Sequence, residues 1–189
     1  MPLNLIRHLD HHTTGIIFVN FNRLPLTKVS LESLINNTKL PHRLVVVDNN
    51  STDNFDVVDG VVVPHNPPYS PSTQEYLNEL RKQGKIHHLL LNAGQIPIHP
   101  EGYNFAECNY GLGFAKNVGV SILMNEGIFG RLPVPEFLFF VDSDYGYHEK
   151  WLEQSYQVWN DTYDKYNIGA MTFTPCPEHP IRGIIQSNY

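Results

Sequence analysis

Two aspartates, one residue apart, end an apolar run in the stretch EFLFFVDSDYGYHEKW. In extended backbone, side chains at positions i and i+2 project to the same side, so Asp142 and Asp144 would meet as like charges. Such a pair repels, and one carboxylate would take up a proton unless a cation is present. Mg²⁺ or Mn²⁺ prefers carboxylate oxygens, and magnesium fills its other positions with water and substrate phosphates. The spacing therefore favours a metal–diphosphate site, and a solvated turn after a strand is the alternative.

A second polar cluster follows the apolar run in VVVDNNSTD. In doubly wound folds an acidic residue after a buried strand accepts a hydrogen bond from a nucleoside, and Asp48 has that position. The alternative is a local turn or helix cap, which the neighbouring Asn, Ser and Thr residues would satisfy equally well. An earlier run ends in FVNFNR, where the side-chain amides of Asn20 and Asn22 could hold a base or a ribose.

Glycines at positions 111, 113 and 119 mark the stretch NYGLGFAKNVGVSIL. Glycine lets the backbone approach a ligand closely, and the N-terminus of a helix attracts phosphate. Lys116 could add a positive charge near a diphosphate. The alternative is an ordinary helix start that contains a packing glycine.

These residues depend on alternating strands and helices for their positions. Apolar runs predict strands over 15–19, 44–47, 85–91 and 136–141, and a fifth over 167–175. Helical spacing predicts helices over 24–38, 72–84, from 114 onward and over 148–166. In the first helix, Leu26, Val29 and either Ser33 or Leu34 recur at helical spacing. Residues 55–72 are predicted to form an exposed excursion with room for one irregular edge strand. The alternation predicts an α/β fold with a mostly parallel sheet and helices on both faces. Ligands bind such sheets at the carboxyl ends of the strands, where all these polar residues stand.

Composition narrows the class of protein further. The formal net charge of −6 gives no general affinity for nucleic acid, and no apolar run approaches the length of a membrane span. Residues 1–13 read as a lead-in without a secretory signal. Cys108 and Cys176 read as unpaired thiols in a reducing compartment. We therefore expect a single cytoplasmic domain.

Taken together and in order, the motifs resemble the GT-A glycosyltransferases, most closely glycosyltransferase family 2. The matching elements are VNFNR, then DNNSTD, then the spacing N-x-G-x-x-x-A-x-N-x-G that begins at Asn109, then D-x-D, and finally Trp151-Leu152. The resemblance runs from about Thr14 to Thr174. It implies the GT-A, Rossmann-like fold and a hexosyltransferase-type, inverting, metal-dependent transfer from a nucleotide-sugar, with a UDP-sugar favoured as donor.

The resemblance also implies roles for individual residues. Asp48 would contact the base, and the residues expected to line the nucleotide-sugar site with it are Asn20, Asn22, Asn50, Lys116, Asn117, Asp142 and Ser143. Asp142 and Asp144 would bind Mn²⁺ or Mg²⁺, which neutralises charge on the leaving nucleoside diphosphate. The acceptor is not implied.

Two departures from the family pattern affect these expectations. The connection from Phe55 to Asn109 is longer than the family usually needs, and the sequence ends at Tyr189, before the usual acidic motif that supplies the base. Glu178 and His179 are the late candidates for a base or a further metal ligand. The chain is then either a donor-binding half of something larger, completed by further domains or subunits, or a minimal member.

Two other functions stay open. A nucleotidyltransferase shares the layered fold and a similar metal site, but VNFNRLPLT lacks the expected glycine-rich loop. A non-catalytic nucleotide-sugar-binding module is the other alternative.

Overall fold

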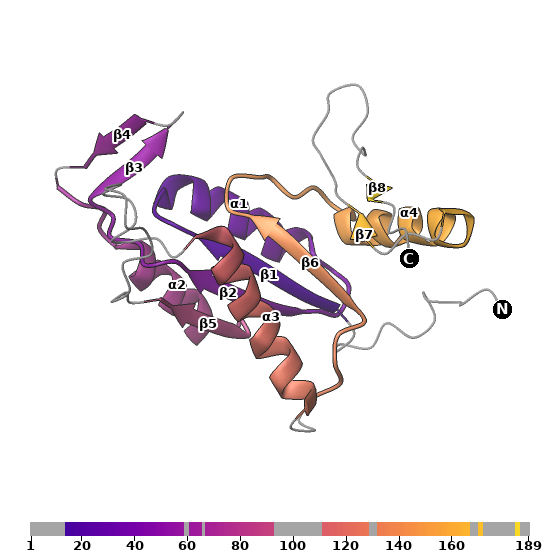
Figure 1. Ribbon diagram of the computed structural model, residues 1–189. Helices are drawn as coiled ribbons and strands as arrows, with labels where there is room; N and C mark the ends of the chain where they lie inside the picture. Colours follow the sequence, from indigo (N-terminus) through magenta and orange to yellow (C-terminus); the bar gives the residue numbers. More distant parts are fainter. Residues whose placement is uncertain are drawn as a thin grey trace. The chain divides into compact units, whose positions relative to one another are not determined.

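The computed structural model describes residues 14–58, 61–65, 67–92, 111–128, 132–166, 170–171 and 184–185. The chain divides into two compact units, of which the larger is Leu9–Glu149 and the other combines Met1–His8 with Lys150–Tyr189. The larger unit contains the main sheet and most of the predicted site residues (Figure 1).

The main sheet has four parallel strands in the order β5-β2-β1-β6. Their bounds are Thr14–Asn20 for β1, Arg43–Asp48 for β2, His88–Leu91 for β5 and Phe137–Asp142 for β6. Every residue of β1 and β2 is buried, because both faces of these central strands are covered. The prediction of a mostly parallel α/β sheet is confirmed.

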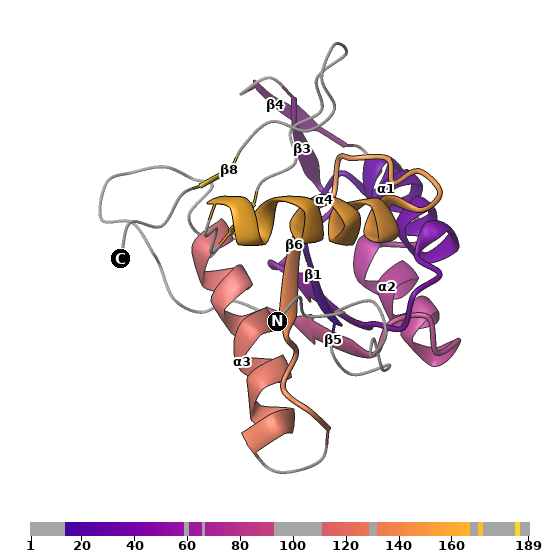
Figure 2. The same ribbon diagram turned by 90° about the vertical axis from the view of Figure 1, so that its right-hand side faces the viewer.

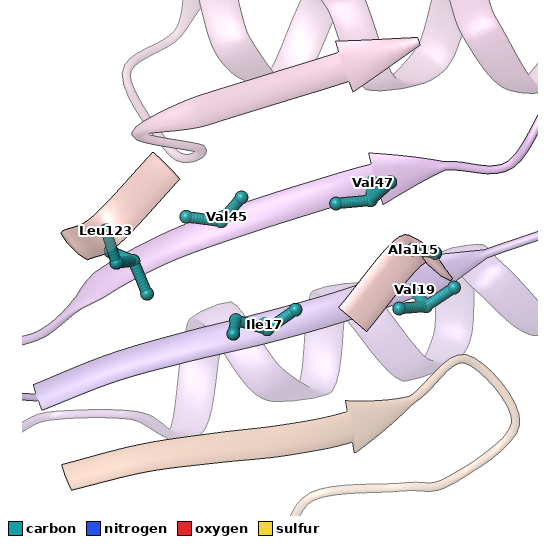
Figure 3. Packing of buried hydrophobic residues seen from close by; sticks show 6 residues of the cluster. All are labelled: Ile17, Val19, Val45, Val47, Ala115 and Leu123. Carbon is teal, nitrogen blue, oxygen red and sulfur yellow. The ribbon is translucent and has the colours of Figure 1, made fainter. Parts of the chain in front are cut away.

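Helices cover the sheet on both faces. Figure 2 shows α3 (Leu112–Ile128) on one side, and α1 (Leu24–Asn37) and α2 (Thr73–Lys82) on the other. On the α3 face, Ala115 and Leu123 pack against four side chains of the central strands, namely Ile17, Val19, Val45 and Val47 (Figure 3). On the other face, the alternate residues of the same strands are fully buried, namely Ile16, Phe18, Leu44 and Val46. This two-sided core fixes the strands whose ends carry the candidate site.

Gly119 determines how closely α3 approaches the sheet. A Cβ atom built at this position would lie 2.5 Å from Cγ2 of Ile17, well inside van der Waals contact. By contrast, Gly111 adopts a positive φ of 83° just before the helix, and an added Cβ at Gly113 would meet nothing within 4 Å. Gly119 is therefore a packing glycine, as the alternative interpretation proposed.

The predicted face of the first helix is wrong for two of its residues. Leu26 is 40% exposed and Val29 is 66% exposed, whereas Leu34 is buried as predicted. The buried residues are Leu24, Thr27, Ser30, Leu31 and Leu34. Thr27 and Ser30 face inward because their hydroxyl groups bond to Asn20 and to the backbone of Asp142. Because two residues of the inner face are polar, the positions of the apolar residues did not identify this face.

Two strand predictions also differ from the structure. The excursion after β2 contains a hairpin of β3 (Phe55–Val58) and β4 (Val61–Pro64) instead of one edge strand. Of the fifth predicted strand, the structure describes Ala170–Met171, which form β7 and pair antiparallel with β8 (Ile184–Ile185) in a separate two-stranded sheet.

The remaining helices follow their sequence signals. Ser72 caps α2 in a capping box with Glu75, and Gly84 follows the helix with a φ of 73°. Helix α4 spans Trp151–Tyr166. Among the described residues, no helix combines the length and the apolar character needed to cross a membrane.

Candidate functional site

Three strand ends meet at one edge of the sheet. In the register of the parallel pairs, Val19 lies opposite Asp142 on β6, and Asn20 lies opposite Asp48 on β2. Strand β1 lies between these two neighbours, and the chain leaves it toward β2 first and reaches β6 later. This is a topological switch point, the position where open parallel sheets bind ligands. The expectation that the polar strand ends share an edge is confirmed.

The same register divides these polar residues between the two faces of the sheet. Successive side chains of a strand point to opposite faces, and paired residues share a face. Asn20 and Asp48 therefore lie on the α1 face, whereas Asp142 lies on the α3 face with Val19. The candidate site thus has two sides, separated by the thickness of the sheet's edge.

On the α1 face, Asp48 is fully buried and accepts four hydrogen bonds. Its Oδ1 accepts from Asn20 Nδ2 at 2.8 Å and from Ser51 Oγ at 2.5 Å. Its Oδ2 accepts from Ser51 N at 3.0 Å and from Gln74 Nε2 at 3.4 Å. Burial raises the pKa of Asp48, and the bonds from Ser51, Asn20 and Gln74 oppose that rise. The structure therefore contains the local turn considered as the alternative, and contact with a base stays a prediction.

Asn20 and Asn22 join the loop after β1 to the loop after β2. Oδ1 of Asn20 accepts from Thr27 Oγ1 at 2.5 Å. Asn22 donates its backbone N–H to Ser51 Oγ at 2.7 Å and its side-chain N–H to the carbonyl of Phe55 at 2.7 Å, while its Oδ1 accepts from Thr52 N at 2.8 Å. Both asparagines are buried, so their observed role is to hold the loops together.

Asp53 extends this network to α2. Its carboxylate accepts from the backbone N–H of Thr73 at 2.8 Å and also from the hydroxyl of Thr73. Sequence reasoning assigned no role to Asp53 or Gln74, considered Ser51 only as a turn partner of Asp48, and considered Thr73 only as a possible cap of α2. The signal for Asp53 was present in DNNSTD, because Asp in a turn cluster commonly bonds to neighbouring backbone. The bonds of Thr73 and Gln74 to this loop gave no signal, since only the fold brings α2 to it.

Backbone atoms hold the turn after β6. The carbonyl of Asp142 accepts from Ser30 Oγ at 3.1 Å and from the Tyr147 hydroxyl at 2.9 Å. Tyr147 N donates to Ser33 Oγ at 2.9 Å, and Asn37 Nδ2 donates to the Tyr147 carbonyl at 2.6 Å. Burial raises the pKa of Tyr147, and the nearby Asp142 carboxylate raises it further, so the phenol stays protonated and donates. The turn is thus fixed on α1 without using the carboxylate of Asp142.

The second aspartate of the motif faces solvent and a cation of the chain itself. The carboxylate of Asp144 lies 3.7 Å from Nη1 of Arg23, and the two side chains are 47% and 34% exposed. No group of three His, Cys, Asp or Glu residues among those described is arranged to hold a metal ion. Strand β6 ends at Asp142 and residues 143 and 144 form a turn, so the extended backbone expected for the two aspartates is not present. A pair of carboxylates would supply only oxygen donors, the type that suits Mg²⁺ or Mn²⁺ completed by water and phosphate.

The remaining predicted residues surround this edge or lie outside the described part of the chain. Nζ of Lys116 lies 5.5 Å from the ring centroid of Phe140, on the same face as Asp142. Asn117 is exposed on α3, and Ser143 is half-buried in the turn after β6. Asn50 is half-buried and has a positive φ of 67°. Glu178 and His179, the late base candidates, fall outside the described residues, as do Cys108 and Cys176.

Comparison with known proteins gives only a fold-level likeness. No protein-family model matches the chain, and no curated protein matches it. Among solved structures, the chain is similar to S. aureus TarS, with 22% identity and a TM-score of 0.46 over 79% of this chain and 20% of that one. It is also similar to TarS 1–349 and to its complex with UDP, each with 21% identity and a TM-score of 0.46 over 82% of this chain and 33% of that one. The chain thus spans a fifth to a third of these structures, and a likeness of this strength carries no argument about function.

Proposed function

We propose that this chain is a metal-dependent glycosyltransferase of the GT-A type, similar to family 2, that uses a nucleotide-sugar donor, with a UDP-sugar favoured. The observation that supports it best is the strand register, in which Asp142 ends β6 beside Val19 at the switch point of a parallel sheet. The ordered motifs of the sequence predicted a D-x-D element at that edge.

In this proposal the α3 face binds the diphosphate. Asp142 and Asp144 would hold Mn²⁺ or Mg²⁺, which supplies positive charge to the leaving diphosphate when bound. Lys116 would add a second positive charge on that face, with Ser143 and Asn117 as polar neighbours of the phosphates and nucleoside.

The α1 face would recognise the nucleoside. Asp48, with Asn20, Asn22 and Asn50, would provide the hydrogen-bonding groups for the base or ribose. Because Asp48 already accepts four bonds, the nucleoside would have to replace the weakest of them, the 3.4 Å bond from Gln74 Nε2. The Gln74 side chain would then have to move away from Oδ2 of Asp48 when the nucleoside binds.

The transfer would proceed with inversion, as the family resemblance implies. The acceptor hydroxyl loses its proton to a general base as it attacks the anomeric carbon, and the nucleoside diphosphate leaves from the opposite side. No residue of the described part is assigned as that base, and the sugar and the acceptor stay open. A nucleotide-sugar-binding module without turnover is the second candidate, because the transfer needs a base and none is assigned among the described residues.

The decisive experiment is calorimetric titration of the full chain with a panel of nucleotide-sugars, with and without Mn²⁺. We expect one UDP-sugar to bind the wild-type chain in the presence of Mn²⁺. The Asp144→Ala variant should not bind it. Asp161→Ala is the matched control, because Asp161 is an exposed aspartate on α4 that only accepts a bond from Gln157 within its own helix. Binding that ignores both the metal and Asp144 would refute the proposal. Release of UDP with an acceptor separates the transferase from the binding module.

A further inference from the structure

Arg23 has an unusual backbone conformation at the switch point. It directly precedes α1 with a φ of 55° and a ψ of 43°, in the left-handed region, and Asn22 before it has a φ of 50°. Two consecutive non-glycine residues in this region are uncommon, because the Cβ atom crowds the backbone there. Such residues persist only where the surrounding structure holds them, and they concentrate at functional sites.

The buried network supplies that support. Asn22 is fixed by its bonds to Ser51 Oγ and to the carbonyl of Phe55, at 2.7 Å each. The carbonyl of Arg23 accepts from the backbone N–H groups of Leu26 at 2.9 Å and Thr27 at 3.0 Å, which begins the helix. The direction in which the Arg23 side chain leaves the backbone is therefore set from both sides.

The side chain so directed reaches the D-x-D motif. Its Nη1 lies 3.7 Å from Oδ2 of Asp144, across the gap between the loop after β1 and the turn after β6. A guanidinium and a divalent cation beside one carboxylate repel each other, and partial exposure to solvent weakens this repulsion. A cation that binds Asp144 would therefore bind less tightly while the guanidinium stays in place.

We infer that Arg23 is an internal counter-cation for Asp144, which holds this carboxylate while the divalent cation is absent and competes with that cation for it. This inference rests on the proposed metal site. Arg23 is thus a positioning residue: it keeps Asp144 oriented toward the switch point and lowers the affinity for the metal alone. The metal then binds well only when a diphosphate adds its own negative charge to the site, which couples metal binding to donor binding.

The test is a titration of the full chain with Mn²⁺ alone, followed by calorimetry, so that the measurement does not depend on turnover. We expect Arg23→Gln to bind Mn²⁺ about two- to fivefold more tightly than the wild type, since exposed ion pairs have that strength. Arg23→Lys keeps the charge and should stay near the wild type. Lys28→Gln is the matched control, because it removes one positive charge from the same helix, where Nζ of Lys28 lies 5.4 Å from the ring centroid of Tyr76.

A second variant guards against a folding effect. Arg23→Gly removes the guanidinium and suits the left-handed conformation, since glycine adopts positive φ without strain. It should show the same gain in Mn²⁺ affinity as Arg23→Gln. If Arg23→Gln and Arg23→Gly both bind Mn²⁺ no more tightly than Lys28→Gln does, Arg23 does not compete with the cation and the inference is wrong. Failure of the proposed function looks different, because the wild type would then bind neither Mn²⁺ nor a UDP-sugar, and both ideas would be wrong.

Discussion

Asn20 and Asp48 end the two central strands of the sheet, and the amide of Asn20 donates a 2.8 Å hydrogen bond to the carboxylate of Asp48. Both side chains are completely buried. Ser51 bonds to both residues, and Gln74 closes the other carboxylate oxygen. This pair therefore holds together the loops on which the rest of the site stands, whether or not a nucleoside also contacts it.

Replacing Asp48 by alanine should destabilise the fold. The substitution leaves buried donors on Asn20 and Ser51 without their acceptor, and each such group costs about 1–3 kcal/mol. We expect the free energy of unfolding, measured with urea, to fall by about 2–3 kcal/mol. Glu79→Ala, at an exposed position of α2, is the control and should change it by less than about 0.5 kcal/mol. A stable Asp48→Ala protein would show that the network is not structural.

Gly119→Ala should also destabilise the fold. The new methyl group would meet Cγ2 of Ile17 at 2.5 Å, so α3 must shift away from β1. Overpacking of this kind costs about 1–3 kcal/mol, which thermal unfolding would register as a lower Tm. Gly113→Ala is the control in the same helix, because its added Cβ meets nothing within 4 Å. It should be neutral or stabilise by up to about 1 kcal/mol. Equal effects at the two positions would contradict the packing argument.

Tyr147→Phe should loosen the turn that carries the two aspartates. It removes the hydrogen bond from the phenol to the carbonyl of Asp142, 2.9 Å long, and should cost about 0.5–1.5 kcal/mol of unfolding free energy. If the turn positions the metal ligands, the affinity for Mn²⁺ falls as well. Tyr145→Phe is the control, since Tyr145 is exposed two residues earlier. If Tyr147→Phe lowers the stability but leaves the Mn²⁺ affinity unchanged, the turn does not position the metal ligands.

Stability should fall as the pH falls below about 6.5, because of histidines at the opposite edge of the sheet. Burial lowers the pKa of His87 and of His42, and for His87 the neighbours His42, His88 and Arg43 lower it further while Glu126 opposes them. The rings of His42 and His87 are in edge contact, with centroids 5.8 Å apart. The N–H of Leu44 donates to Nδ1 of His87 at 3.0 Å, a bond that only the unprotonated nitrogen can accept.

The sign of this effect follows from proton binding. Below the ordinary histidine pKa the unfolded chain binds protons that the folded chain does not, so acid favours unfolding. Urea denaturation at steps from pH 7.5 to 5 measures the slope. His87→Gln keeps an acceptor without a titrating group and should flatten the slope. Asp48 contributes with the opposite sign, because its raised pKa makes the folded chain bind the extra proton at lower pH, and so the comparison between variant and wild type isolates the histidine.

The sequence predicted the sheet well because its strands are continuous apolar runs that end in polar residues. It also predicted the edge at which those ends meet, since parallel strands align their carboxyl ends. The inner face of α1 could not be predicted from hydrophobicity, because Thr27 and Ser30 are buried for their hydrogen bonds rather than for apolar area. The bonds of Thr73 and Gln74 could not be predicted either, because their partners lie twenty or more residues away and meet them only in the folded chain.

The division of the site between two faces was hidden for a related reason. Whether Asp48 and Asp142 share a face depends on which residue of β1 lies opposite each of them, and the strand patterns alone leave that register undetermined. Arg23 is the last residue of the motif VNFNR, but its ion pair with Asp144 could not be predicted, because it joins segments far apart in the chain. Its positive φ is likewise visible only in the structure.

The adjacent residues Val19 and Asn20 of β1 point to opposite faces of the sheet, and they pair with Asp142 and Asp48, respectively. This offset of one residue places the two aspartates on opposite faces. An odd change in the number of residues within this strand exchanges its two faces from that point on. In the gene, an in-frame insertion or deletion of one codon in β1 would turn buried apolar side chains toward the polar network and break both halves of the site together. Selection should therefore remove such one-codon changes, in a strand whose fully buried side chains also leave little room for substitution.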